Sequence, residues 1–126
     1  MNLSTPLAKA RGLGSAKSGT HHWIAQRLTA IALIPLSIWF VFSLVCITDM
    51  DYGAAIEWVN SPLVAVFLLV FIIALFYHTQ LGLQVVIEDY IDCKAIKITS
   101  LILLQLITLF AGLAAATAVL KIYLGS

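Results

Sequence analysis

The sequence predicts an all-α membrane protein with three transmembrane helices. Of its 126 residues, 62% are hydrophobic and 10% are charged, whereas soluble domains average about 45–50% apolar and about 25% charged residues. Three runs without Asp, Glu, Lys or Arg are each long enough to cross the roughly 30 Å hydrocarbon core of a bilayer as a helix. These runs are residues 28–47, 62–87 and 98–120. We expect the helices themselves to cover about residues 22–47, 62–90 and 96–123.

The segment before the first run differs in composition from the rest of the chain. Residues 1–20 are rich in Gly, Ser, Ala and Lys and show no apolar periodicity, so we expect an irregular cytoplasmic tail there. Pro35 lies inside the first run, where its missing backbone N–H can kink a membrane helix. Residues 1–126 would form a single membrane-anchor domain, with no length for a separate catalytic domain.

The distribution of Lys and Arg predicts the orientation, because cytoplasmic loops of membrane proteins carry an excess of basic residues. In a three-helix topology, Lys121 is the only basic residue on the side of the membrane opposite the N-terminus. The other six basic residues precede the first helix or lie between the second and third: Lys9, Arg11, Lys17, Arg27, Lys94 and Lys97. We therefore expect a cytoplasmic N-terminus and a periplasmic C-terminus in a multi-pass protein of the bacterial cytoplasmic (inner) membrane, or a mitochondrial inner-membrane equivalent. The net charge of +1 indicates no nucleic-acid partner.

Other features indicate packing rather than chemistry. Trp58 is expected to be an interfacial anchor. Residues 111–118, AGLAAATA, would let helix backbones approach closely, either within the bundle or against another subunit. Cys46 and Cys93 should lie toward opposite membrane faces, which excludes a disulfide between them.

His78 is the only strongly ionisable residue in the second run. It precedes Glu88 by ten residues, which puts it about 15 Å from the cytoplasmic end of its helix. A polar group at such depth is costly unless it is bonded, so a functional role is the first hypothesis. A neutral imidazole can be an axial ligand of haem iron, or it can hydrogen-bond a neighbouring helix. Both explanations fit the residue taken alone.

The same face of this helix carries Gly82, Val85 and Asp89. Gly82, one turn from His78, would leave room for a flat macrocycle, although ordinary helix packing uses glycine equally well. His21 and His22 precede the first apolar run and lie on the order of 15 Å from the depth of His78. If His78 holds a six-coordinate haem, the second ligand must therefore come from another chain.

Two segments carry a resemblance to a known family. Residues 11–17 and 19–30 read RGLGSAK and GTHHWIAQRLTA. Residues 78–90 read HTQLGLQVVIEDY, with a glycine four residues after the histidine and an Asp-Tyr pair eleven and twelve residues after it. Both segments resemble the hydrophobic membrane anchor subunit of succinate dehydrogenase, in its alphaproteobacterial or mitochondrial-like form. The three-helix layout extends the resemblance over the whole chain.

The resemblance implies a role for each matching residue of the haem site. His78 would be one axial ligand of haem b and Gly82 its neighbour on the helix, with the second ligand supplied by a partner cytochrome b subunit. Arg27 would pair with a haem propionate, with His21 on the same side, although the adjacent His22 makes that histidine ambiguous. Without the resemblance, Arg27 is equally a snorkelling topology anchor, and the two histidines are interfacial.

The resemblance also implies a quinone site. Tyr90 would donate a hydrogen bond to a carbonyl of ubiquinone, the substrate, and Asp89 would tune the site or relay protons. A tyrosine at the bilayer edge has an apolar ring and a wet hydroxyl, which suits this role. Taken alone, the Asp89-Tyr90 pair also fits a helix end followed by an interfacial aromatic anchor.

The function implied is that of a membrane anchor subunit of succinate dehydrogenase, respiratory complex II. Such a subunit transfers electrons from succinate to quinone in the tricarboxylic acid cycle and respiratory chain, within a heterotetramer that includes a flavoprotein and an iron–sulfur subunit. This chain shows no nucleotide fingerprint and no cysteine set for an iron–sulfur cluster, so we expect no activity from it alone. Two alternatives lack haem: a small transporter or channel subunit in which His78 relays protons, and a structural assembly subunit.

Overall fold

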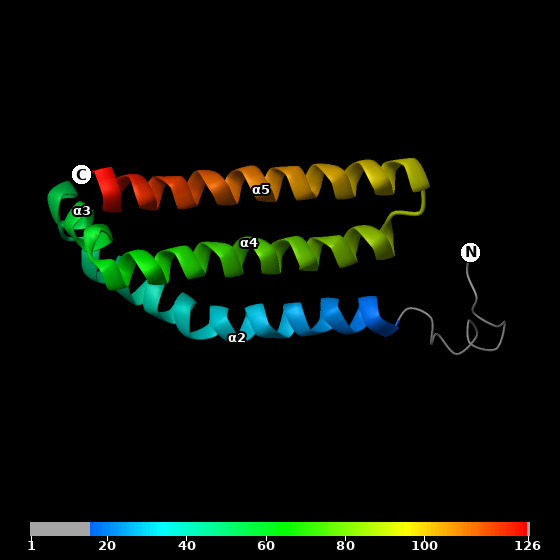
Figure 1. Cartoon of the computed structure of the whole chain (residues 1–126), viewed down its shortest axis with the longest axis horizontal. Coiled ribbons are helices and arrows are strands. Elements are labelled where there is room, and N and C mark those ends of the chain that lie inside the picture. The colour runs from blue at the N-terminus through cyan, green and yellow to red at the C-terminus, as the bar shows by residue number, and fades with distance from the viewer. Residues whose placement is uncertain (1–15, 126) are drawn as a thin grey trace.

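The structure, a computed structural model, describes residues 16–125 and consists there of four helices. In chain order these are α2 (Ala16–Ile47), α3 (Tyr52–Asn60), α4 (Pro62–Tyr90) and α5 (Lys94–Gly125). Figure 1 shows the three long helices side by side, with α4 in the middle and in contact with both α2 and α5. Each long helix is long and apolar enough to span a membrane. The predicted all-α architecture with three spans is confirmed.

The first helix begins earlier than the sequence predicts. It begins at Ala16, about six residues before the predicted start near residue 22, so residues 16–20 are helical rather than part of the tail expected over residues 1–20. A helix at the edge of a membrane keeps its backbone groups hydrogen-bonded without water. The remainder of the predicted tail, residues 1–15, including Lys9 and Arg11, lies outside the described residues.

The link between the first two spans also contains a helix, α3. The Asp51 carboxylate caps its start, because Oδ1 accepts a hydrogen bond of 2.9 Å from the backbone N–H of Ala54. Figure 1 shows α3 at the end of the bundle opposite the α4–α5 turn. Cys46, at the end of α2, and Cys93, in the α4–α5 turn, therefore lie at opposite ends of the bundle, and both thiols are free.

Aromatic side chains join three helices at the α3 end. Pro35 lies inside α2, and the axis of α2 changes direction in its second half (Figure 1), as a proline in a helix interior explains. Beyond it, the Trp39 ring stacks on Trp58 of α3 with centroids 5.7 Å apart and meets Phe67 of α4 edge-on at 5.4 Å. Trp58, predicted as an interfacial anchor, thus also fixes α3 against α2.

The helices pack through small side chains. Five apolar side chains are buried among the described residues, and two of them are alanines of α4, Ala65 and Ala74. Gly112 of α5 faces the Phe76 ring of α4, since a Cβ built on Gly112 would lie 3.6 Å from it. Part of the predicted small-residue stretch therefore serves packing within this chain. Many large apolar side chains are exposed, which lipid or another membrane chain can cover without cost.

Polar side chains of α4 form a hydrogen bond to each neighbouring helix. His78 Nδ1 lies 3.0 Å from Thr29 Oγ1 of α2, and Gln80 Oε1 lies 3.1 Å from Thr108 Oγ1 of α5. Two residues along a helix correspond to a rotation of about 200°, so His78 and Gln80 point to opposite sides of α4. This alternation matches the position of α4 between α2 and α5.

We expect Gly112→Leu to destabilise the α4–α5 contact by about 1–3 kcal/mol, because the longer side chain overpacks the Phe76 ring. Gly112→Ala should be tolerated, since the added Cβ would make ordinary van der Waals contact at 3.6 Å. Thermal denaturation of the purified protein in mild detergent measures the difference, with Ala114→Leu on the exposed side of α5 as the control. Equal midpoints for Gly112→Leu and the control would show that α4 and α5 do not pack here.

Candidate functional site

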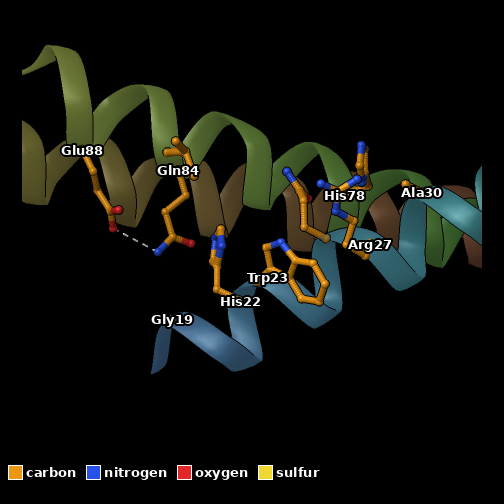
Figure 2. A pocket seen from close by; sticks show the side chains of 10 residues that line it. Gly19, His22, Trp23, Arg27, Ala30, His78, Gln84 and Glu88 are labelled. Atoms are coloured by element: carbon orange, nitrogen blue, oxygen red, sulfur yellow. Dashed lines mark hydrogen bonds between the residues drawn. The ribbon is translucent and has the colours of Figure 1, made fainter. Parts of the chain in front are cut away.

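A groove of about 740 Å³ lies along α2 and α4 and is lined by residues of both helices (Figure 2). From α2 the lining residues recur every three or four positions, which puts them on one face of the helix. The residues are Gly19, His22, Trp23, Gln26, Arg27 and Ala30 of α2, and His78, Gln84, Val85 and Glu88 of α4. The groove therefore extends from the end of α4 toward the middle of the bundle, and both polar and apolar groups line it.

His78 is at the end of the groove that lies deepest in the bundle. Figure 2 shows its imidazole near Arg27 and Ala30, at the opposite end of the site from Glu88. The ring is half-buried, and Nδ1 is bonded to Thr29 Oγ1 at 3.0 Å. Among the described residues, Thr29 is the one hydrogen-bond partner of the imidazole. The second ring nitrogen, Nε2, is therefore left for a partner outside this part of the chain.

Arg27 supplies a positive charge to the groove. Its Cζ lies 5.5 Å from the centroid of the Trp23 ring, one turn earlier on the same face of α2. This cation–π contact is worth roughly 0.5–1 kcal/mol at an exposed position, and it holds the guanidinium beside the groove. A guanidinium in this position can form a bidentate pair with a carboxylate of a ligand.

Two polar atoms on the α2 wall are buried without a partner among the described residues, namely His22 Nε2 and Gln26 Oε1. A buried polar atom without a hydrogen bond costs about 1–3 kcal/mol, so these atoms indicate a polar ligand or another chain at the groove. Gly82 borders the same place, since a Cβ built on it would lie 3.8 Å from Gln26 Nε2. The Gln26 amide thus approaches the helix surface that the glycine leaves open.

The residues predicted from the sequence fall into two groups. His78 and Arg27 line the groove, and Gly82 lies next to it. Asp89 and Tyr90 do not line it, because they lie at the last positions of α4, where both side chains are exposed, Tyr90 to 81%. His21 is also exposed and off the groove, whereas its neighbour His22 is half-buried and lines it.

Several residues in or beside the groove were not predicted from the sequence. Trp23, Gln26 and Thr29 were not predicted, because no face was assigned to the helix expected over about residues 22–47. Extending the 100° period back to Gly19 would have gathered Trp23 and Gln26 on the face of Arg27. Gln84 was also missed. Its Nε2 donates a 3.1 Å hydrogen bond to Glu88 Oε1, as Figure 2 shows.

The small number of metal-binding side chains limits the kind of metal centre that this site can hold. No group of three or more His, Cys, Asp or Glu side chains gathers within the described part of the chain. A bare metal ion usually needs three or four protein ligands, whereas haem iron needs only axial ones, because the macrocycle supplies the rest. The donor set at this groove fits an axially ligated macrocycle with acidic substituents.

The fold and the groove together define a class: a small multi-pass membrane protein with a polar groove along one pair of its three spans. Comparison with known proteins then specifies the family. The family model described as succinate dehydrogenase/fumarate reductase transmembrane subunit matches residues 1–120. The chain belongs to this family, and the resemblance inferred from residues 11–30 and 78–90 is confirmed.

The relatives carry consistent names. The succinate dehydrogenase hydrophobic membrane anchor subunit of Rickettsia bellii (strain RML369-C) is 39% identical over 113 residues, which is 90% of each chain. The same subunit of Rickettsia conorii is 37% identical over 106 residues, 83% of this chain and 84% of the relative. That of Paracoccus denitrificans is 32% identical over 91 residues, 71% of this chain and 70% of the relative. This agreement supports a role as membrane anchor, with the chain crossing the membrane several times.

Proposed function

We propose that this membrane anchor subunit of succinate dehydrogenase co-ligates haem b through His78 and contributes Tyr90 and Asp89 to a site of ubiquinone reduction. The observation that carries the haem assignment is the position of His78. Its imidazole lines a groove deep in the bundle, with one nitrogen bonded to Thr29 and the other unused within residues 16–125. When bound, haem b supplies a one-electron carrier between the succinate-oxidising subunits and the quinone.

The part of the groove away from His78 suits the propionate side of a haem. Arg27 would pair with a propionate, and His22 Nε2, buried without a partner in the described chain, would donate a hydrogen bond beside it. Trp23 and Val85 supply apolar walls. We assign the propionate contact to His22 rather than to His21, because His21 is exposed and does not line the groove.

The second axial ligand would come from the partner cytochrome b subunit. Thr29 is level with His78, because the two side chains are hydrogen-bonded. His22 precedes Thr29 by seven residues, or about 10 Å of helical rise, and His21 is farther away. Neither histidine of α2 can reach the iron that His78 would hold, so the groove would be one half of a site between two membrane subunits.

The quinone role is assigned to the end of α4. Reduction of ubiquinone to ubiquinol takes up two electrons and two protons, so the site needs a hydrogen-bond donor for a carbonyl oxygen and a route to water. The Tyr90 hydroxyl would be the donor, and the adjacent Asp89 carboxylate would exchange protons with the aqueous phase. Both side chains are exposed in this chain, which is where the flavoprotein and iron–sulfur subunits would dock and complete the site.

The orientation that we propose has the N-terminus in the cytoplasm and the C-terminus in the periplasm. The N-terminal end of α2 and the α4–α5 turn lie at the same end of the bundle (Figure 1), so Lys94 and Lys97 are at the end of the bundle from which α2 starts. Among the described residues, the opposite end holds one basic side chain, Lys121, near the end of α5. This asymmetry of charge supports the proposed orientation.

His78→Leu should remove the b-type absorption of the assembled complex, because the iron loses an axial ligand. The measurement is the reduced-minus-oxidised spectrum of the complex purified in mild detergent. Gln80→Leu is the matched control: it also removes a polar interhelical contact of α4, but on the opposite side. A His78→Leu complex with its full haem content would contradict the ligand assignment.

His22→Leu should weaken haem binding roughly tenfold or more, the effect of losing one hydrogen bond to a charged group of about 1.5–3 kcal/mol. His21→Leu should have little effect, because that side chain is exposed outside the groove. The rate of haem transfer from the complex to an apo-acceptor protein measures the difference. Faster haem transfer from the His21→Leu complex than from the His22→Leu complex would assign the propionate contact to His21.

Tyr90→Phe should lower kcat/KM for ubiquinone about tenfold, since a net hydrogen bond is worth roughly 1–1.5 kcal/mol. Succinate oxidation with an artificial electron acceptor should persist, because that reaction takes place in the partner subunits. Tyr123→Phe, at the far end of α5, is the control. Loss of both activities in parallel would argue against a local role for Tyr90 at the quinone.

A further inference from the structure

The hydroxyl of Thr29 is within hydrogen-bond distance of three acceptors or donors. Its Oγ1 lies 2.8 Å from the carbonyl oxygen of Ala25, 3.1 Å from that of Gln26 and 3.0 Å from His78 Nδ1. A hydroxyl has one proton to donate and can accept with its lone pairs. Thr29 can therefore donate to its own helix and accept from His78 at the same time.

The geometry of the helix indicates which of these contacts the Thr29 hydroxyl donates. A threonine inside a helix donates to the carbonyl four residues earlier, and the contact with Ala25 is the shortest of the three. If its proton is directed to the α2 backbone, Oγ1 would accept from His78, and Nδ1 of the imidazole would carry the proton. A neutral imidazole has one N–H, which leaves the lone pair on Nε2.

We propose that Thr29 is the positioning residue for His78: it fixes the Nδ1–H tautomer and the ring orientation, and so presents the Nε2 lone pair to the haem iron. This inference rests on the proposed haem site. Metal-binding histidines are commonly held in this way by an acceptor on the second ring nitrogen, which also makes the imidazole a stronger electron donor. Here the acceptor belongs to α2, so the packing of α2 on α4 sets the coordination.

Thr108 provides an internal comparison. Its Oγ1 lies 2.8 Å from the carbonyl oxygen of Leu104 and 3.1 Å from that of Gln105, and it contacts Gln80 of α4 at 3.1 Å. The two threonines thus bond to their own helices in the same way and link α4 to a neighbour on opposite sides. If the contact of Thr29 served helix packing alone, the two threonines would be equivalent in their effect on haem.

The test uses the assembled complex with Thr29→Val, which keeps the shape of the side chain and removes the acceptor oxygen. We expect haem to be lost roughly 10–100-fold more readily and the haem midpoint potential to shift to more positive values, because a weaker imidazole donor stabilises ferric iron less. Potentiometric titration of the b-type band and the haem-transfer rate measure these effects. Thr29→Ala should shift the potential in the same direction, and Thr29→Ser should restore the wild-type value.

Thr108→Val is the matched control and should keep the wild-type potential. Unchanged potential and haem retention in Thr29→Val and Thr29→Ala would overturn the inference, and so would equal shifts in Thr29→Val and Thr108→Val. Failure of the proposed function would look different. In that case the wild-type complex would lack a b-type band, or the His78→Leu complex would retain it.

Discussion

The candidate site depends on the way a polar imidazole is accommodated between two helices in the apolar part of a membrane. A group that can hydrogen-bond is stable at this depth only if each of its polar atoms finds a partner. Thr29 satisfies one ring nitrogen of His78 at 3.0 Å. The other is left open, and the groove between α2 and α4 lies beside it. The open nitrogen is the chemical reason to expect a ligand in this groove.

The groove is open on one side rather than an enclosed cavity. The described part of the chain likewise leaves surfaces that other molecules can cover. Large apolar side chains cover its outside, the few buried ones include small residues of α4, and two polar atoms of α2 lack partners within residues 16–125. A chain with these properties is suited to assembly with other membrane subunits, which agrees with the names of its relatives. The C-terminal end of α4, where Asp89 and Tyr90 are exposed, adds a second surface that a water-soluble subunit can cover.

Much of the fold could be predicted from the sequence, because length and apolar composition suffice to identify spans. The start of α2 at Ala16 was not predicted, since residues 16–21 are mostly polar and show no apolar period, and α3 was not expected because its nine residues are short for a periodic signal. For the site, the depth of His78 and its spacing to Asp89 and Tyr90 were visible in the sequence. Thr29 was not, because the register of α2 against α4 is a tertiary property that neither helix encodes alone.

The most direct test is a density map of the assembled complex at a resolution that separates side chains. We expect a planar macrocycle in the α2–α4 groove, with its iron bonded to Nε2 of His78 and to a side chain of the partner subunit, and with Nδ1 of His78 still hydrogen-bonded to Thr29. Lipid or protein side chains filling the groove, with both nitrogens of His78 bonded to protein, would contradict this expectation.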